Sequence, residues 1–509
     1  MKLRTISTCL ATAAMLLPLY AEAQETARMA PANTGVFIEI NNLAEHRADW
    51  EADPVAKLLR DHFPSPPQSA EWLAVQDALE MTSEQIIDTF FGQTIALIGR
   101  EPGPNQPVVL LSRIVPEDGE KARERLLLVE GDKVGNFRTY TTTDGRARFA
   151  FNGEWMAIAN VDHDEYLREV LGHDADTGTL ADDDNFIAWM ERVPQDRTGT
   201  VYMHNRTRGE THVLGIVKPD RNTTLHYAGY SPAFRQIFAR LSDAERFDFG
   251  PVPRSTLAAL TLNVYDPNPR PGRANAFLDQ LLAPTTLREV MGQLEAPTVF
   301  FFGEVPGQQL DQNPGFAVPV IGLAIKLRDE TAAEHLDRGF NNAMLMLSLA
   351  AASSPQPLPQ LNTRQATHAG TRYNVVNLGE LLAVQSQRPE LKHMQLAYGR
   401  IKDWYVICSQ EMFFRQAISS QRGDFAPADA ANDMQPIARG FVRPTALGTH
   451  LIGLAEHFSN QNLPNVAPDT WPNLKVLGQA MTFYKSVNLQ FHRADDDAII
   501  GKLEVLRED

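Results

Sequence analysis

The hydrophobic positions of the chain fall into short apolar runs that suit strands and spaced apolar positions that suit helices. In residues 81–103, "MTSEQIIDTFFGQTIALIGREPG", isoleucines and a phenylalanine recur at i, i+1 and i+4, the spacing of one helical face, and an unbroken apolar run follows. Thr82 and Gln85 have the Thr-x-x-Gln form of a capping box at a helix start. The segment therefore predicts a capped helix, a buried strand and a Pro-Gly turn.

The same pattern recurs about two hundred residues later. Residues 285–307, "TTLREVMGQLEAPTVFFFGEVPG", align with 81–103 without a gap, and Thr286 with Glu289 repeats the capping box. Three further pairs of segments match in the same order, namely 108–129 with 320–345, 135–143 with 370–377, and 149–171 with 396–418. The last pair places Trp155 on Trp404 and "YLREVL" on "FFRQAI". This order predicts a tandem duplication of one α+β unit.

The two predicted units meet near "DPNPRPGR" (266–273), because its prolines and glycine continue neither a helix nor a central strand. We therefore expect a first unit over 24–268 and a second over 269–509. A strand-like run at 256–265 closes the first unit, and a hairpin over 486–506 closes the second. This order of elements favours a mostly antiparallel sheet in each unit, with helices packed on one face.

Two local patterns add detail to this fold. Asp144-Gly145 is a dipeptide suited to a tight hairpin turn. The longest apolar run, "AMLMLSLAAA" from Ala343, is too short for a membrane span, so we interpret it as a buried helix.

The first 23 residues have the pattern of a secretory signal peptide. Lys2 and Arg4 precede a short apolar stretch, and Ala21-Glu22-Ala23 forms a small-x-small ending, which predicts cleavage after Ala23. We therefore expect an exported protein, periplasmic or secreted, whose mature chain has no integral membrane span. The formal net charge of the whole chain is −16, and removal of the signal peptide makes it one unit more negative. That balance argues against nucleic acid and anionic lipid as partners.

The acidic knot Asp162-His163-Asp164-Glu165 is among the densest groups of potential ligands in the chain. One interpretation is a metal site for zinc, manganese or calcium, joined by His173, Asp174 and Asp176. The other is a capping box with Asp162 as N-cap and Glu165 at N3. We favour capping, because the repeat keeps Ser409 and Glu411 at the matching place without the cluster.

Other candidate chemistry is sparse. Residues 173–186 resemble a calcium loop but lack its third acid and its glutamate, so Asp182 to Asp184 are interpreted as a helix start. Cys408, the one cysteine after cleavage, is either a nucleophile or a small buried side chain, and its apolar run favours burial. The chain has no His-Glu-x-x-His, Gly-x-Ser-x-Gly or Walker-type motif. We therefore assign no catalytic, cofactor-binding or metal-binding residue, and no cofactor.

A resemblance to a known family rests on four stretches: "NTGVFIEINNLAE" (33–45), "FFGQTIALIG" (90–99), "FNGEWMAIAN" with "YLREVL" (151–171), and "GTLADDDNFIAWMERVPQDRTGTVYMHN" (178–205). In these the chain resembles the bacterial exported-protein family known as domain of unknown function 3352. The resemblance is best over 30–205 and implies export and an α+β fold; it brings no activity and no catalytic residues.

Three hypotheses of function remain. The first is a non-catalytic envelope or periplasmic protein that binds another protein or a small ligand through a surface or groove. The second is a periplasmic hydrolase or metal-dependent enzyme whose site is assembled from dispersed residues. The third is a structural subunit of an envelope assembly, which predicts a contiguous exposed apolar patch.

Overall fold

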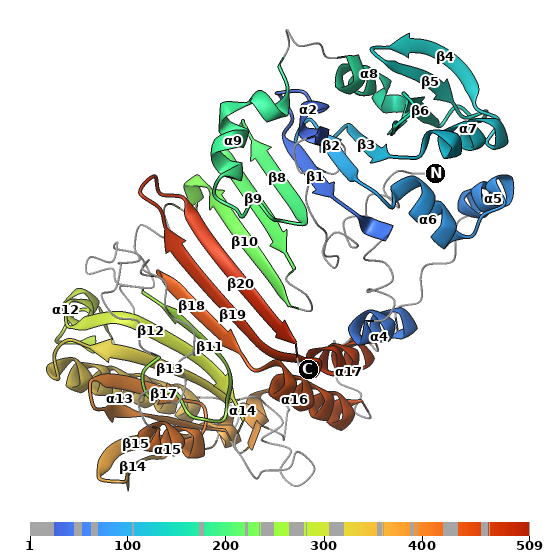
Figure 1. The fold of residues 1–509 in the computed structure, drawn as a ribbon. Coiled ribbons are helices and arrows are strands. Elements are labelled where there is room, and N and C mark those ends of the chain that lie inside the picture. The colour runs from blue at the N-terminus through green and yellow to red at the C-terminus, as the bar shows by residue number, and fades with distance from the viewer. Residues whose placement is uncertain are drawn as a thin grey trace. The chain divides into compact units, whose positions relative to one another are not determined.

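The computed structural model divides the chain into two compact units, which are described separately (Figure 1). It describes residues 25–44, 53–62, 70–103, 106–172, 178–218, 222–233, 235, 249–263, 279–280, 282–304, 320–353, 359, 361–386, 391–392, 394–420, 436–459, 467 and 469–507. Unit 1 comprises residues up to Arg235 and Ala494–Leu506, and unit 2 comprises Gln236–Arg493 with the last three residues. The division therefore differs from the expected 268/269 boundary, and part of the predicted C-terminal hairpin belongs to unit 1. The predicted signal peptide and linker 266–273 lie outside the described residues.

Unit 1 is an antiparallel sheet with the strand order β4-β5-β6-β7-β3-β2-β1-β8-β9-β10-β20. Its strands are β1 (Val36–Ile40), β2 (Ile95–Gly99), β3 (Val108–Arg113), β4 (Val129–Val134), β5 (Phe137–Thr141), β6 (Ala147–Phe151), β7 (Trp155–Asn160), β8 (Gly199–Asn205), β9 (Glu210–Val217), β10 (Thr223–Tyr230) and β20 (Ile499–Arg507). Its helices are α2 (Glu25–Arg28), α4 (Pro54–His62), α5 (Ala70–Leu79), α6 (Ser83–Phe91), α7 (Pro116–Arg125), α8 (Asp164–Gly172) and α9 (Asp184–Met190), with 3-10 turns η1 (Val161–His163) and η2 (Leu180–Asp182).

Within unit 2 the strands pair antiparallel in the order β14-β15-β16-β17-β13-β12-β11-β18-β19. Its strands are β11 (Thr256–Leu262), β12 (Leu294–Gly303), β13 (Val320–Leu327), β14 (Thr363–His368), β15 (Thr371–Asn377), β16 (Gln395–Ile401), β17 (Trp404–Cys408), β18 (Ala438–Val442) and β19 (Tyr484–Arg493). Its helices are α12 (Leu287–Gly292), α13 (Thr331–Ala352), α14 (Gly379–Ser386), α15 (Glu411–Ser419), α16 (Pro444–Phe458) and α17 (Thr470–Met481).

The strand order of unit 2 matches that of unit 1 from β4 through β9, and the registers match too. In unit 1 one row of paired residues is Ile158, Leu110, Leu97, Ile38, Val201 and Leu214. The row at the same place in unit 2 is Ile407, Leu323, Phe300, Leu260, Gly440 and Leu489. Residues related in this way are called matching positions below. Trp155 and Trp404 match, since Trp155 pairs with Arg113 and Trp404 with Lys326.

One detail of the gapless alignment is wrong. By strand pairing Gly99 matches Phe302, one residue before the Gly303 that the alignment indicates. The pairing of β12 with β13 is irregular between Glu295 and Thr298, which is typical of a β-bulge. A bulge adds a residue to one strand, and sequence letters alone do not show where that residue sits.

Helices cover both faces of each sheet, so the prediction that helices pack on one face is wrong. In unit 1 Leu167 of α8 packs in the cluster that contains Phe37, whereas Phe90 of α6 packs in the cluster on the opposite face. In unit 2 Phe413 of α15 and Phe340 of α13 occupy the two corresponding clusters. The α+β class and the antiparallel pairing are confirmed. The apolar run "IALIG" of β2 is buried on both sides, and such runs lack the alternation of a one-sided sheet.

The predicted starts of several elements are confirmed. Thr82 with Gln85 and Thr286 with Glu289 form complete capping boxes. Asp183 is the N-cap of α9 and accepts a hydrogen bond from the backbone of Phe186. Asp144-Gly145 lies in the turn between β5 and β6.

The apolar run from Ala343 lies in α13, but it is not buried as predicted. Leu345 and Leu349 are each 59% exposed, and Met346 is also exposed, while Met344 faces the core. Helical spacing places Leu345 and Leu349 one turn apart on one face, so the run has an inner and an outer apolar side. Among the described helices none combines the length and apolar character that crossing a bilayer requires.

Replacing either capping threonine with alanine will destabilise the helix that it begins. We expect Thr82→Ala and Thr286→Ala each to lower the free energy of unfolding by about 1 kcal/mol, because the cap satisfies a backbone N–H that is otherwise unpaired. Urea unfolding followed by circular dichroism measures the change. Thr143→Ala, in an exposed turn, is the control and should change it by less than about 0.5 kcal/mol. Equal values for the three variants would contradict the role of the caps.

Candidate functional site

The acidic knot of residues 162–165 lies where β7 leads into α8. The chain first makes the 3-10 turn η1, with Asn160 as its N-cap and no capping hydrogen bond from that side chain, and α8 begins at Asp164. Asp162 therefore lies inside the turn, and the predicted capping box of Asp162 with Glu165 is wrong in its residues. A 3-10 turn ahead of a helix moves the helix start by one turn, which spacing in the sequence does not reveal.

Asp164 is held by two arginines. Arg148 Nε on β6 lies 2.9 Å from Asp164 Oδ1, and Arg168 Nε donates to Oδ2 over 3.0 Å. Arg168 also donates from both Nη atoms to Asp132 on β4, over 2.6 and 3.0 Å. The hydrogen bonds from Arg168 hold the pKa of Asp132 well below its usual range. These ion pairs tie the start of α8 to the β4–β6 edge of the sheet.

Unit 2 repeats this arrangement at α15. Arg415 Nη2 lies 2.6 Å from Glu411 Oε1, Tyr373 donates to the same oxygen over 2.9 Å, and Arg364 pairs with Oε2. Burial raises the pKa of Glu411, but the hydrogen bonds from Tyr373 and Arg415 and the charges of both arginines outweigh it, so the net pKa is lowered. The carboxylates of Glu411 and Asp164 are therefore both engaged in ion pairs with arginines. Neither is free to bind a metal ion or to act as a general base.

The metal interpretation gains no support. Across the described ranges no three or more histidine, cysteine, aspartate or glutamate side chains gather in a way that would hold a metal ion. His163 Nδ1 accepts a long hydrogen bond, 3.5 Å, from the backbone of Val108. His173, Asp174 and Asp176 lie outside the described residues, which resume at Gly178 within the calcium-like loop.

Cys408 is fully buried in β17, among the aromatic side chains of α15. Burial raises the pKa of its thiol, which disfavours the reactive thiolate. The position suits a small core residue, as its apolar sequence predicts.

The thiol of Cys408 should be unreactive while the protein is folded. With the chain beginning at Gln24, we expect no reaction with Ellman's reagent within minutes under native conditions and one thiol per chain in guanidinium, because the thiolate forms only when the core opens. Fast reaction of the native protein would restore Cys408 as a candidate nucleophile.

A buried polar group in the middle of the unit 1 sheet was not foreseen. Glu39 on β1 is 1% exposed and accepts a 2.5 Å hydrogen bond from Thr26 Oγ1. Burial raises the pKa of Glu39 to about 7, against the lowering effects of the Thr26 hydrogen bond and the Arg197 charge. Arg197 Nε donates to Thr200, the residue opposite Glu39 on β8, over 2.9 Å. Unit 1 thus contains a buried carboxyl group and a buried guanidinium, and the charge of Arg197 only partly offsets the effect of burial on Glu39.

The stability of unit 1 should fall as pH rises from about 4.5 to about 7. Folding raises the pKa of Glu39 from 4.5 to about 7. Between these pH values the folded protein therefore retains a proton that the unfolded chain releases. Its stabilising effect is complete below about pH 4.5 and is lost by about pH 7, a loss on the order of 3 kcal/mol. Glu39→Gln should remove this slope and be more stable than the parent at pH 8. Thermal unfolding from pH 5 to 8 measures it.

Glu154→Gln, in the exposed turn between β6 and β7, is the matched control and should keep the parental pH dependence. A Glu39→Gln protein with the same slope as the parent would show that another group is responsible.

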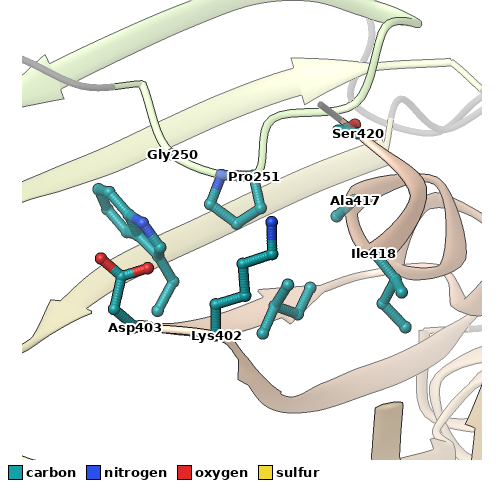
Figure 2. Close-up of a pocket in the computed structure, with 9 residues that line it drawn as sticks. Gly250, Pro251, Lys402, Asp403, Ala417, Ile418 and Ser420 are labelled. Carbon is teal, nitrogen blue, oxygen red and sulfur yellow. The ribbon is translucent and has the colours of Figure 1, made fainter. Parts of the chain in front are cut away.

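A pocket of about 120 Å³ lies in unit 2 beside the β16–β17 turn. Figure 2 shows Lys402 extending from that turn toward Pro251, with Asp403 on one side and Ala417 and Ile418 on the other. The complete lining is Gly250, Pro251, Ile401, Lys402, Asp403, Trp404, Ala417, Ile418 and Ser420. Most of these side chains are apolar, and Lys402 and Asp403 are exposed at the opening. A cavity of similar size holds a benzene ring in an engineered protein, so this one accommodates a group of only a few atoms.

The backbone on either side of the pocket is unusual. Gly250 has a φ of +62°, and a Cβ there would lie 2.8 Å from the Trp404 ring, so the loop lies directly against the indole. Lys402 has a φ of +54°, a conformation that favours glycine, and the matching residue in unit 1 is Gly153. A lysine kept in a strained conformation at the mouth of a pocket is a reason to infer a role for its ammonium group.

Sequence reasoning missed every member of this pocket, because its residues come from three separate stretches. The detectable signals were weak: "FGPVP" before a strand, and "IKDW" where the first half has "FNGEW". Comparison with known proteins adds no further assignment, since no family model, no curated protein and no solved structure matches this chain.

Proposed function

We propose that this is an exported, non-catalytic binding protein of the bacterial envelope, with unit 2 holding a small ligand in the pocket beside Trp404. The pocket itself carries the proposal: an apolar lining of Ile401, Trp404 and Ile418 with the ionised groups of Lys402 and Asp403 at its opening. Such a lining is typical of ligand sites, where apolar walls supply affinity and a few polar groups supply orientation. The signal-peptide pattern of residues 1–23 supports export.

The proposal has two further parts: how the two units arose, and which family the chain belongs to. The matching strand orders and registers of the two units support a tandem duplication, as do the two helix starts at which a carboxylate is held by arginines. Membership of the exported-protein family described above rests on its four sequence stretches. The α+β class is what that family implies.

Enzymatic function finds less support. The carboxylates of Asp164 and Glu411 are held by arginines, and the Cys408 thiol is buried. A role as an assembly subunit has one observation in its favour, the exposed apolar side of α13 with Leu345 and Leu349. Scattered exposed apolar residues are common, but several together on one helix favour a contact surface.

The pocket proposal is tested by screening small aromatic and aliphatic acids by ligand-observed NMR against the protein. We expect a hit that also changes tryptophan fluorescence, because the indole of Trp404 lines the pocket. Lys402→Asn should weaken that hit by roughly tenfold, since asparagine tolerates the positive φ but removes the charge. The stability of the Lys402→Asn protein should not fall.

The matched control is Lys485→Asn, an exposed lysine of the same unit that does not line the pocket, and it should bind like the parent. Binding that survives Lys402→Asn unchanged would place the ligand elsewhere. No hit in the screen would remove the support for a small acid as ligand.

A further inference from the structure

A second buried guanidinium lies in unit 2, at a place in the sheet where the neighbouring strand has a threonine and not a glutamate. Arg439 on β18 is 8% exposed and lies opposite Thr261 of β11. Within the described part of the chain its Nη2 atom has no hydrogen-bond partner, and neither has Thr261 Oγ1, which is 0% exposed. The guanidinium lies over the ring of Phe249, whose centre is 6.0 Å from Cζ.

An unpaired guanidinium in this position is unfavourable. Arginine stays protonated in proteins, so burial cannot be relieved by loss of the proton, although burial lowers the pKa of Arg439. A buried charge persists in a folded protein when an opposite charge or a set of hydrogen bonds meets it. The aromatic ring offers a cation–π contact but satisfies none of the N–H groups.

The residues at the matching positions of unit 1 differ from those of unit 2. By strand order and register, Thr261 matches Glu39, and Arg439 matches Thr200. In unit 1 the charge of Arg197 acts on the Glu39 carboxyl group, and Arg197 Nε donates a hydrogen bond to Thr200. Unit 2 therefore keeps a buried guanidinium at this place but has a threonine hydroxyl where unit 1 has the carboxylate.

We infer that Arg439 and Thr261 form a site for a small carboxylate, which takes the place that the Glu39 side chain occupies in unit 1. The guanidinium donates two N–H groups in a planar fork that matches two carboxylate oxygens, and the Thr261 hydroxyl donates a third hydrogen bond. Arg439 keeps 8% of its surface exposed, and the proposed ligand of a few atoms must enter from that side. This site is separate from the pocket at Trp404, since neither residue lines that pocket.

The test uses sodium propionate, which reproduces the side chain of glutamate, with sodium chloride at equal ionic strength as reference. We expect propionate to raise the thermal midpoint of the protein in a saturable way, because a ligand that binds only the folded state stabilises it. Chloride should give no saturable shift. If propionate and chloride act alike on the parent protein, the inference is wrong.

Two variants assign the effect to this place. Arg439→Met should lower the apparent propionate affinity by on the order of ten- to hundredfold, the loss of a charge-assisted hydrogen bond. Thr261→Glu restores the carboxylate of unit 1, so it should abolish the propionate response and raise the midpoint in its absence. Arg372→Gln, an exposed arginine on β15, is the control and should respond like the parent. A full propionate response in folded Arg439→Met or Thr261→Glu protein would overturn the assignment.

Discussion

Both units depend on one constraint: each sheet is apolar on both faces, so each face must be covered. In β2, for example, Ile95 and Ile98 point to opposite faces and both are buried. Helices α8 and α6 cover the two faces in unit 1, and α15 and α13 do so in unit 2. With both faces packed, hydrophobic burial supplies most of the stabilisation. Polar and ionisable groups then remain at strand turns, at helix starts and at a few buried places in the sheets.

The helix starts show how such polar groups are used. Asp164 and Glu411 each occupy the first residue of a helix, where a negative charge is favoured by the helix dipole, and each is held by two arginines. These groups fasten a helix to neighbouring strands. A dense group of acids in the sequence was therefore a guide to how a helix docks, and a poor guide to chemistry.

Local patterns predicted the local structure well. The capping threonines, Asp183 and the Asp144-Gly145 turn act through residues next to them in the chain, so sequence spacing contains the necessary information. The covering of both sheet faces, the bulge before Thr298 and the return of β20 to unit 1 depend on contacts between distant residues. The same holds for the pocket, whose members Gly250, Lys402 and Ile418 meet only after folding. Glu39 and Arg439 were missed because a single charged residue in a strand gives no sign of being buried.

The two units differ at two matching positions that the proposed binding sites use. At the turn before the matching tryptophans Trp155 and Trp404, unit 1 has Gly153, which adopts a positive φ without strain. Unit 2 has Lys402 at the matching position. A side chain in that conformation costs about 1 kcal/mol. At the buried sheet position, unit 1 has Glu39, whereas unit 2 has Thr261 opposite Arg439, whose Nη2 has no hydrogen-bond partner among the described residues. At the turn the strained residue lies in unit 2, and at the buried sheet position each unit holds an ionisable group, Glu39 in unit 1 and Arg439 in unit 2. Both differences fit the proposed duplication with unit 2 as the proposed binding unit.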